Sequence, residues 1–274
     1  MSKLCRIVFW NLNRKDLTDL VCDLAAATEA DVVVLNESVV PIRTTQQALH
    51  SKVDRRFFVP KSSSEERFQC FCRNSALDLT EVHKGFRSSI RKLNLGSTYA
   101  LLGLVHGVDM RNYDSETRQS AAQYLAEEIR FVISHQGHNR LILMGDFNMN
   151  PYDRGMNLAL GLNAMMTRAC VTAGHRTFQG KQYDFYYNPM WSLFGDGSQG
   201  PAGTVYDTSN QGPYGWNMLD QVIINHTIVE NLDDIQILTH AGSTCLTDAK
   251  GRPSTRKASD HFPILVTLKG TDND

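Results

Sequence analysis

The sequence lacks any apolar run long enough to cross a lipid bilayer, which takes about 20 residues. It also lacks the apolar core and small-residue cleavage site of a secretory signal, because the segment after Met1 enters a strand-like run by Ile7. These absences argue against a membrane-spanning protein and against an exported one. We therefore expect a cytoplasmic protein with no membrane partner, and the sequence gives no sign of an obligate protein partner.

Net charge is almost absent as well. The chain has 28 basic and 29 acidic residues, for a formal charge of -1. A protein that holds nucleic acid mainly through bulk charge is usually strongly basic. Nucleic-acid binding would therefore rest on local patches of basic residues, or on a weak and transient encounter.

Cysteine is scarce, with six residues in 274. The shortest spacing is Cys70-Phe71-Cys72, and one C-x-C without a second pair is weak evidence for zinc. In a strand both of these thiols would face one side of the sheet. We expect reduced, mostly buried thiols, which are typical of a cytosolic protein.

Apolar sequence is plentiful, at 42% of the residues. No shift of composition divides the chain, so we expect one domain over residues 1–274 with a large core. Apolar residues at helical spacing predict helices over residues 16–28, 44–51, 115–134 and 153–160. The third helix is expected to bury Ala121, Leu125, Ile129 and Val132.

Strand-like runs outnumber the helical ones. They cover residues 5–11, 31–35, 55–59, 67–73, 77–83, 88–93, 99–106, 141–144, 219–224, 235–238 and 264–268. The short runs in the middle of the chain favour antiparallel hairpins, whereas residues 195–215, rich in Gly, Ser, Asn and Pro, predict a long loop. Because hairpins interrupt the alternation of strand and helix, an α/β fold with a two-layer β-sandwich flanked by helices fits better than a doubly wound open sheet.

Polar residues stand at the ends of several of these runs. Glu37 follows an apolar strand and suits a hard cation such as Mg²⁺, which prefers oxygen ligands. A helix N-terminus or a surface acid explains Glu37 about equally well from spacing alone. Asp146 and Asn148 follow another strand, where they could hold or activate a water, although a tight strand-to-helix turn also favours these residue types.

Acids and imidazoles recur near the C-terminus. An acid next to an imidazole orients the ring and favours its protonated form, and an imidazolium stabilises charge at a phosphorus centre. His261 has Asp260 beside it in the chain. A second acid that could pair with the ring, Asp220, stands upstream in the run Leu219-Asp220-Gln221. His106 ends a further strand, where a lone histidine is more often structural.

Six motifs occur in one order along the chain: Trp10-Asn11-x-Asn13, Leu35-Asn36-Glu37, Val105-His106, Gly145-Asp146-Phe147-Asn148, Leu219-Asp220-x-Val222 and Ser259-Asp260-His261. The series, which spans residues 10–268, resembles the endonuclease/exonuclease/phosphatase superfamily, which includes deoxyribonuclease I and the abasic-site endonucleases. The resemblance implies the deoxyribonuclease I-like four-layer fold and a phosphoester hydrolase that uses Mg²⁺ or Mn²⁺.

The resemblance also implies roles on the metal side of such a site. Glu37 would be the principal metal ligand, and Asp260 would complete the network of metal-bound waters. Asn11 would contact the phosphate or those waters. Asn13 stands where several relatives carry Asp, which is expected to weaken cation binding and to favour one-metal operation.

The remaining implied roles concern the chemistry. Asp146, helped by Asn148, would position or activate the attacking water, and His261, paired with Asp220, would bind the scissile phosphate. His106 would assist the leaving group. Residues 66–73 resemble the deoxyribonuclease I strand whose glutamate supports that histidine, so Glu66 is expected to back His106.

Substrate clues are local. The basic residues Arg252, Arg256 and Lys257 precede the last motif, and Trp216 in the long loop could stack on a base. A second basic cluster contains Lys84, Arg87, Arg91 and Lys92. Solvated loop charge explains either cluster alone more simply, and Trp216 could equally hold its loop to the core.

Three hypotheses follow. The leading one is a metal-dependent nuclease that acts on DNA ahead of RNA by direct attack of water. The second is a phosphatase or phosphodiesterase for a small phosphorylated molecule or lipid headgroup. The third is a catalytically silent scaffold, which the complete set of acid, amide and imidazole residues argues against.

Overall fold

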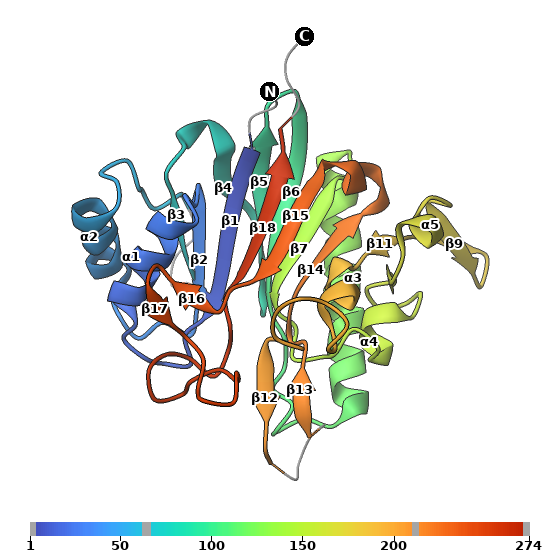
Figure 1. Cartoon of the computed structure of the whole chain (residues 1–274). Helices are drawn as coiled ribbons and strands as arrows, with labels where there is room; N and C mark the ends of the chain where they lie inside the picture. Colours follow the sequence, from blue (N-terminus) through green and yellow to red (C-terminus); the bar gives the residue numbers. More distant parts are fainter. Residues whose placement is uncertain (1–3, 62–66, 210–213, 271–274) are drawn as a thin grey trace.

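Two β-sheets pack face to face at the centre of the computed structural model, which describes residues 4–61, 67–209 and 214–270 (Figure 1). The first sheet has the strand order β15 (Leu232–Ile237), β18 (Ile264–Lys269), β1 (Leu4–Asn11), β2 (Val32–Asn36), β3 (Phe68–Cys72). The second has the order β4 (Asp78–Lys84), β5 (Ser88–Leu95), β6 (Thr98–His106), β7 (Leu141–Asp146), β14 (Asp220–Asn225), β11 (Tyr186–Tyr187), β8 (Ala164–Met165).

Strand β2 shows why the sheets stack into layers. Its apolar run Val32–Leu35 is buried on both faces. Val32 and Val34 pack into the core between the sheets, whereas Val33 and Leu35 pack beneath helices α1 (Thr18–Ala27) and α2 (Ile42–Lys52). A strand that is apolar on both sides needs a cover on both sides, which this arrangement provides.

Strand β3 obeys the same rule. Cys70 and Cys72 both face the core between the sheets and Phe71 faces the helices, as the alternation predicts. Burial raises the pKa of the Cys72 thiol to about 12. The thiols of β3 are therefore structural apolar groups in the folded chain.

Helix α3 (Ser115–Gln136) covers the outer face of the second sheet. The Asp114 side chain accepts a hydrogen bond from the Thr117 amide at its start, and Gly137 ends it in the left-handed conformation. The fully buried side chains of the helix are Ala122, Ala126, Ile129 and Val132. Leu125 is partly buried and packs against the same core, as predicted, whereas Ala121 is only partly buried and its neighbour Ala122 takes the buried position.

The predicted strand at residues 55–59 is also wrong. Phe58 makes only an isolated bridge to Cys72, and the chain before it turns, because the Asp54 carboxylate accepts a hydrogen bond from the Arg56 amide. The predicted loop at residues 195–215 includes one strand of a hairpin, β12 (Val205–Asp207), which pairs with β13 (Gly215–Asn217). The helix predicted at residues 153–160 shrinks to α4 (Arg154–Asn157).

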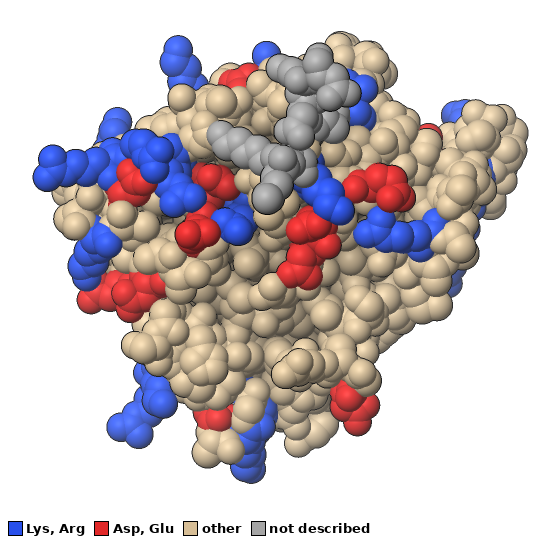
Figure 2. Space-filling model, turned by 45° about the horizontal axis from the view of Figure 1, so that its top comes forward, with Lys and Arg blue, Asp and Glu red and all other residues tan. Residues whose placement is uncertain are grey.

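Short elements complete the chain. They are η1 (Ser75–Leu77), α5 (Arg168–Val171), β9 (His175–Phe178), β10 (Lys181–Asp184), η2 (Pro189–Leu193), η3 (His226–Asn231), β16 (His240–Ala241) and β17 (Thr244–Cys245). Among the described residues no helix combines the length and the apolar character needed to cross a membrane. On the face seen in Figure 2, the basic and acidic side chains of the described residues gather mostly in the upper part, where the two signs lie side by side, and a wide area below them carries few of either.

Strand direction brings the motif residues to one edge of the sandwich. β1 and β2 run parallel, and their ends place Asn11 opposite Asn36. β6 and β7 also run parallel, and their ends place His106 opposite Asp146. Antiparallel β14 begins at the same edge, with Asp220 paired to Asp146. The ladders of both sheets therefore fix where the polar side chains stand.

Candidate active site

Asp146 lies at the centre of the polar edge. Its Oδ2 accepts hydrogen bonds from the side-chain amides of Asn11 (3.0 Å) and Asn148 (3.2 Å). Its Oδ1 accepts one from the Asn148 backbone N–H at 2.9 Å. The side chain is buried, and burial raises the pKa of its carboxyl.

The chain makes a tight turn directly after β7, which is one of the two alternatives that the sequence left open. Asn148 has a φ of +52° and is not extended, yet its side chain still reaches Asp146. The tight turn is therefore present, and the role of the two side chains toward a water stays a prediction. The turn brings the amide to the carboxylate more closely than alternation along a strand would.

His261 and Asp220 form the second part of the site. His261 Nδ1 lies 2.8 Å from Asp220 Oδ2, and the Asp220 side chain is fully buried. Burial opposes a charge on the ring, but the carboxylates of Asp220, Asp146 and Asp260 outweigh it and raise the pKa of His261 to about 10. The imidazole is therefore a cation near neutral pH.

Two further hydrogen bonds hold the His261 segment against β1. The Trp10 indole Nε1 donates to the His261 carbonyl at 2.9 Å, and the Ser259 hydroxyl donates to the Asn11 carbonyl at 2.6 Å. Asp260 lies between these anchors, half-buried, with its Oδ1 4.0 Å from His261 Nε2. The segment before β18 is thus fixed to the end of the strand that carries Asn11.

Glu37 forms the third part of the site, across from Asp146. Its carboxylate lies 3.4 Å from His106 Nε2 and 3.7 Å from Arg14 Nε. The hydrogen bond with His106 lowers the pKa of the Glu37 carboxyl. Asn13 lies next to this group in the turn after β1, where its amide N–H donates to the Asn11 side chain at 3.0 Å.

Backbone strain concentrates at this edge. Glu37 has a φ of +49°, and Asn13 and Arg14 have φ of +47° and +56°. Left-handed conformations are unfavourable for side chains such as Glu and Arg, and they are often retained where function fixes a side chain. The Glu37 conformation turns the chain sharply at the end of β2.

His106 has a partner that the sequence reasoning missed. Arg67 Nη1 lies 3.3 Å from His106 Nδ1. A guanidinium only donates hydrogen bonds, so Nδ1 accepts and the ring hydrogen sits on Nε2, which faces Glu37. Glu66, the predicted support of His106, lies outside the described residues. The only sequence signal for Arg67 was its place next to Glu66 in the strand compared with deoxyribonuclease I.

Donor atoms for a cation are present. Carboxylate oxygens of Asp146 and Asp220 and a ring nitrogen of His261 all lie within 4.8 Å of one another, but the cationic imidazole has no lone pair to offer a metal, so the carboxylate oxygens are the donors. The buried Asp220 Oδ1 has no hydrogen-bond partner among the described residues, although a buried carboxylate oxygen needs one. With Glu37 and Asp260 nearby, the donor set is rich in carboxylate oxygen, which fits a hard divalent cation.

The predicted substrate residues divide into two kinds. Arg256 and Lys257 are exposed on the loop before Ser259. Arg252 is half-buried, pairs with Asp248 at 2.8 Å, and places its guanidinium 5.0 Å from the centre of the Tyr206 ring. The first two are available to a ligand, whereas Arg252 already has partners.

Trp216 belongs to a stack of aromatic rings. Its ring centre lies 5.2 Å from that of Tyr206 and 6.4 Å from that of Phe262, which follows His261 in the chain. The side chain is half-buried. Trp216 therefore connects the β12–β13 hairpin to the segment that carries His261, which is the structural alternative that the sequence left open.

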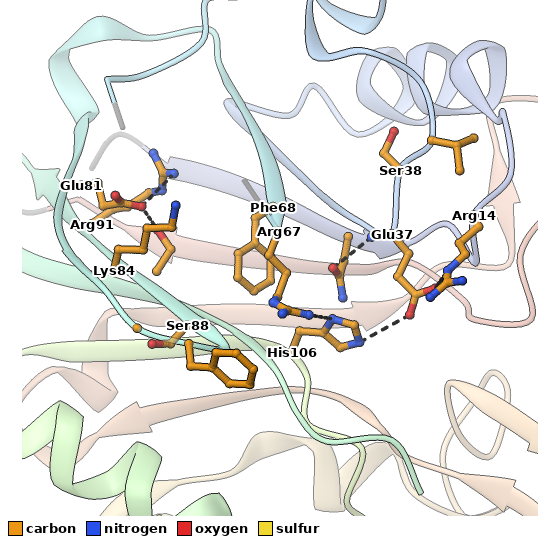
Figure 3. A pocket seen from close by; sticks show the side chains of 15 residues that line it. Arg14, Glu37, Ser38, Arg67, Phe68, Glu81, Lys84, Ser88, Arg91 and His106 are labelled. Carbon is orange, nitrogen blue, oxygen red and sulfur yellow. Dashed lines mark hydrogen bonds and ion pairs between the residues drawn. The ribbon is translucent and has the colours of Figure 1, made fainter. Parts of the chain in front are cut away.

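A cavity of about 560 Å³ opens beside Glu37 and His106 (Figure 3). Its lining includes Arg14 from the turn after β1, Arg67 from just before β3, and Lys84 from the end of β4 at the edge of the second sheet. Sequence reasoning placed neither arginine in the site, although Arg14 directly follows the Trp10-Asn11-x-Asn13 motif. The cavity gives the polar edge a cationic recess on the His106 side.

Comparisons with solved structures agree with this fold. The chain is similar to Danio rerio TDP2 complexed with a single-strand DNA product, with 18% identity, a TM-score of 0.57, and 97% of this chain and 99% of that chain covered. It is also similar to the human nocturnin catalytic domain with bound sulfate, with 15% identity, a TM-score of 0.56, and 99% of this chain and 97% of that chain covered. A third similar structure is a Bacteroides thetaiotaomicron protein described as an endonuclease/exonuclease/phosphatase family protein, with 14% identity, a TM-score of 0.57, and 98% of each chain covered.

A search of curated protein sequences finds no match. Because the identity to the solved structures is so low, the similarity supports only the fold. The family model described as Endonuclease/Exonuclease/phosphatase family matches residues 8–261, which include all six motifs. The chain therefore belongs to the endonuclease/exonuclease/phosphatase family of phosphoester hydrolases.

Proposed function

We propose that this chain is a divalent-metal-dependent phosphodiesterase that cleaves nucleic acid, DNA ahead of RNA, by direct attack of a water. We further propose that residues 1–274 form one domain with this single activity. The observation that supports the proposal most is the convergence of Asp146, Glu37 and the Asp220–His261 pair at one edge, from strands of both sheets.

Asp146 is the group that orients and deprotonates the water. Its burial raises its pKa, which makes the carboxylate a stronger base than an exposed one. The amides of Asn11 and Asn148 hold it in place and leave its remaining acceptor directions for a water. The water oxygen bonds to phosphorus, its proton passes to Asp146, and the bond from phosphorus to the leaving oxygen breaks.

His261 binds the phosphate that reacts. Its charge is held by the buried Asp220 carboxylate, so the imidazolium is in place before the substrate arrives. A fixed cation of this kind stabilises the charge that grows on the phosphoryl oxygens in the transition state. His106, whose ring Arg67 holds, offers its Nε2–H as a hydrogen bond to the leaving oxygen, and that oxygen takes its proton from solvent.

A bound Mg²⁺ or Mn²⁺ would neutralise phosphoryl charge and polarise the phosphorus–oxygen bonds. Glu37 and Asp260 would hold it, with Asn13 beside them. Asn13 contributes no charge, so we propose a site that binds one cation moderately, through few protein ligands and several waters.

The proposal of nucleic acid draws on two observations. The D. rerio TDP2 structure, similar in fold, contains a single-strand DNA product. In this chain Arg256 and Lys257 are exposed beside the His261 segment, where contacts to backbone phosphates need no particular sequence.

The test is cleavage of supercoiled plasmid, linear duplex, single-stranded DNA and RNA with Mg²⁺ or Mn²⁺, with EDTA as a control. Asp146→Asn is expected to lose activity by several orders of magnitude while remaining folded. Asp184→Asn is a matched control, because Asp184 also accepts side-chain amide hydrogen bonds, but from Asn139 and from Asn225 at the far end of β14. Cutting that survives EDTA or Asp146→Asn would refute the proposal.

A phosphodiesterase for small molecules is the second candidate. The cavity beside His106, at about 560 Å³, has the size of a small-ligand pocket. Hydrolysis of bis(p-nitrophenyl) phosphate without cutting of any polymer would favour it over the nuclease.

A further inference from the structure

Phe86 stands almost bare at the tip of the β4–β5 hairpin. Its side chain is 84% exposed, the highest value among the large apolar residues in the described part of the chain. The guanidinium groups of Arg67 and Arg87 lie 5.9 Å and 5.7 Å from the centre of its ring. An exposed aromatic ring is ordinary on its own, whereas one flanked by two arginines is a defined chemical surface.

The hairpin tip is fixed to the active-site edge. The Arg87 carbonyl accepts a hydrogen bond from the His106 amide at 3.0 Å, and Arg87 Nη1 donates to the Gly107 carbonyl at 2.8 Å. On the other side the Ser88 hydroxyl donates to Glu128 of α3 at 2.8 Å. The position of the Phe86 ring is thus tied to that of His106 rather than left to a loose loop.

Phe86 also borders two cavities. One is the cationic cavity that contains Glu37 and His106, and the other, of about 280 Å³, is mostly apolar and lies between His106 and α3. His106 lines both cavities. The ring therefore stands beside the place where the leaving side of a phosphodiester would emerge.

We propose that Phe86 is the stacking platform for an unpaired nucleobase adjoining the reacting phosphate on the His106 side, with the guanidinium groups of Arg67 and Arg87 placing positive charge beside the phosphates of that nucleotide. The inference rests on the proposed function for the identity of the reacting group. Every base has an aromatic face that can stack on a ring. The two guanidinium groups beside Phe86 complement the negative phosphates on either side of a nucleotide.

The surroundings favour a nucleotide over an apolar partner. Arg14, Arg67 and Lys84 line the cationic cavity, and each would be costly to cover with apolar surface. A base paired inside a duplex presents its face only to its neighbours in the stack. The platform therefore selects single-stranded segments, or strand ends that can splay.

The experiment compares two fluorescein-labelled probes, a single-stranded 12-mer of deoxyadenosine and an abasic 12-mer with the same phosphates. Binding to the whole chain is followed by anisotropy in EDTA, so that no cleavage takes place. Phe86→Ala is expected to bind the deoxyadenosine 12-mer roughly 5- to 100-fold more weakly, the range for one lost stacking contact. Its affinity for the abasic 12-mer is expected to stay the same, and Phe86→Trp is expected to restore the base preference.

Phe178→Ala is the matched control, because Phe178 is an exposed phenylalanine on the remote hairpin of β9 and β10. It is expected to bind both probes as the wild type does. Equal affinity of the wild type for both probes, equal losses on both in Phe86→Ala, or no binding of either probe would each overturn the inference. A wild type that prefers the base-bearing probe but cleaves no nucleic acid would support the platform and refute the proposed nuclease, so the two failures are distinguishable.

Discussion

The side-chain amide of Asn11 donates a hydrogen bond to Asp146 across the two sheets, at 3.0 Å. Asn11 ends β1 of the first sheet, and Asp146 ends β7 of the second. The contact joins the two halves of the sandwich at the point where the chemistry is proposed to take place. The orientation of the proposed base therefore depends on how the sheets pack, and not only on its own strand.

Asn11→Ala tests this dependence. The Asp146 carboxylate would lose one of the amides that hold it, and we expect kcat/KM to fall about 100-fold, as for a lost preorganising hydrogen bond. The measurement is steady-state hydrolysis of bis(p-nitrophenyl) phosphate, with circular dichroism to confirm folding. Asn225→Ala removes an equally buried asparagine at the far end of β14 and should leave kcat/KM nearly unchanged. Comparable activity in the two variants would contradict the prediction.

Glu37→Gln tests the metal ligand. The amide keeps the shape of the side chain but removes its charge, and a hard cation binds carboxylate more strongly than amide. We expect the Mg²⁺ concentration for half-maximal activity to rise at least about 100-fold, the upper end of the effect seen for residues that only support a ligand. The check is a Mg²⁺ titration of activity, with Asp248→Asn as a control acid outside the site. An unshifted titration curve would remove Glu37 from the metal site.

His261 predicts a pH dependence of stability in the metal-free protein. Burial opposes its charge, but the neighbouring carboxylates raise its pKa from an ordinary value near 6.5 to about 10. As the pH rises, the unfolded chain therefore loses this proton at a lower pH than the folded chain does. The contribution of the charged imidazole to the free energy of unfolding is complete below about pH 6.5 and is lost as the pH rises toward 10. The greatest slope for one such group is about 1.4 kcal/mol per pH unit.

Urea unfolding in EDTA at pH 6.5, 8 and 9.5 measures this effect. We expect the free energy of unfolding of the wild type to fall over the series, and that of His261→Gln to fall less. Parallel profiles for the two proteins would show that the imidazole is not held as a cation. The comparison needs no substrate and does not depend on catalysis.

Of the three basic residues predicted to bind substrate in the loop before Ser259, we expect only two to contact the phosphates of nucleic acid. Arg256 and Lys257 are exposed, and replacing both by Ala should lower the slope of log affinity against log salt for single-stranded DNA by up to about 1.4. Arg252 already pairs with Asp248 and lies against Tyr206, so Arg252→Ala should change the slope little. The opposite order of effects would mean that Arg252 leaves Asp248 to meet the phosphate.

Much of the site could be predicted because its residues directly follow or precede strong apolar strands. The run Val32–Leu35 predicts a strand buried on both faces, and Glu37 stands just beyond its end. The two-sheet α/β fold was predicted correctly for the same reason, since hairpin-forming runs interrupt the alternation of strand and helix. Local pattern was sufficient wherever burial and strand direction decide where a side chain stands.

Other features depend on contacts between distant segments, and these could not be predicted. Arg67 meets His106 only because β3 and β6 lie in different sheets that face each other across the cavity. The turn at Arg56 forms because Asp54 satisfies its amide, which strand-like composition does not reveal. A cytoplasmic location stays a prediction, as do the roles assigned to the site residues.

The pairing of Asp146 with Asp220 in the β7–β14 ladder has a consequence for how the protein could fail. A slip of one residue in that ladder would turn every side chain of one strand to the opposite face of the sheet, with one of the two carboxylates among them. Such a misregistered chain would have no catalytic centre. Enzymatic turnover is then a stricter assay of correct strand registration than circular dichroism, which would scarcely distinguish the two forms.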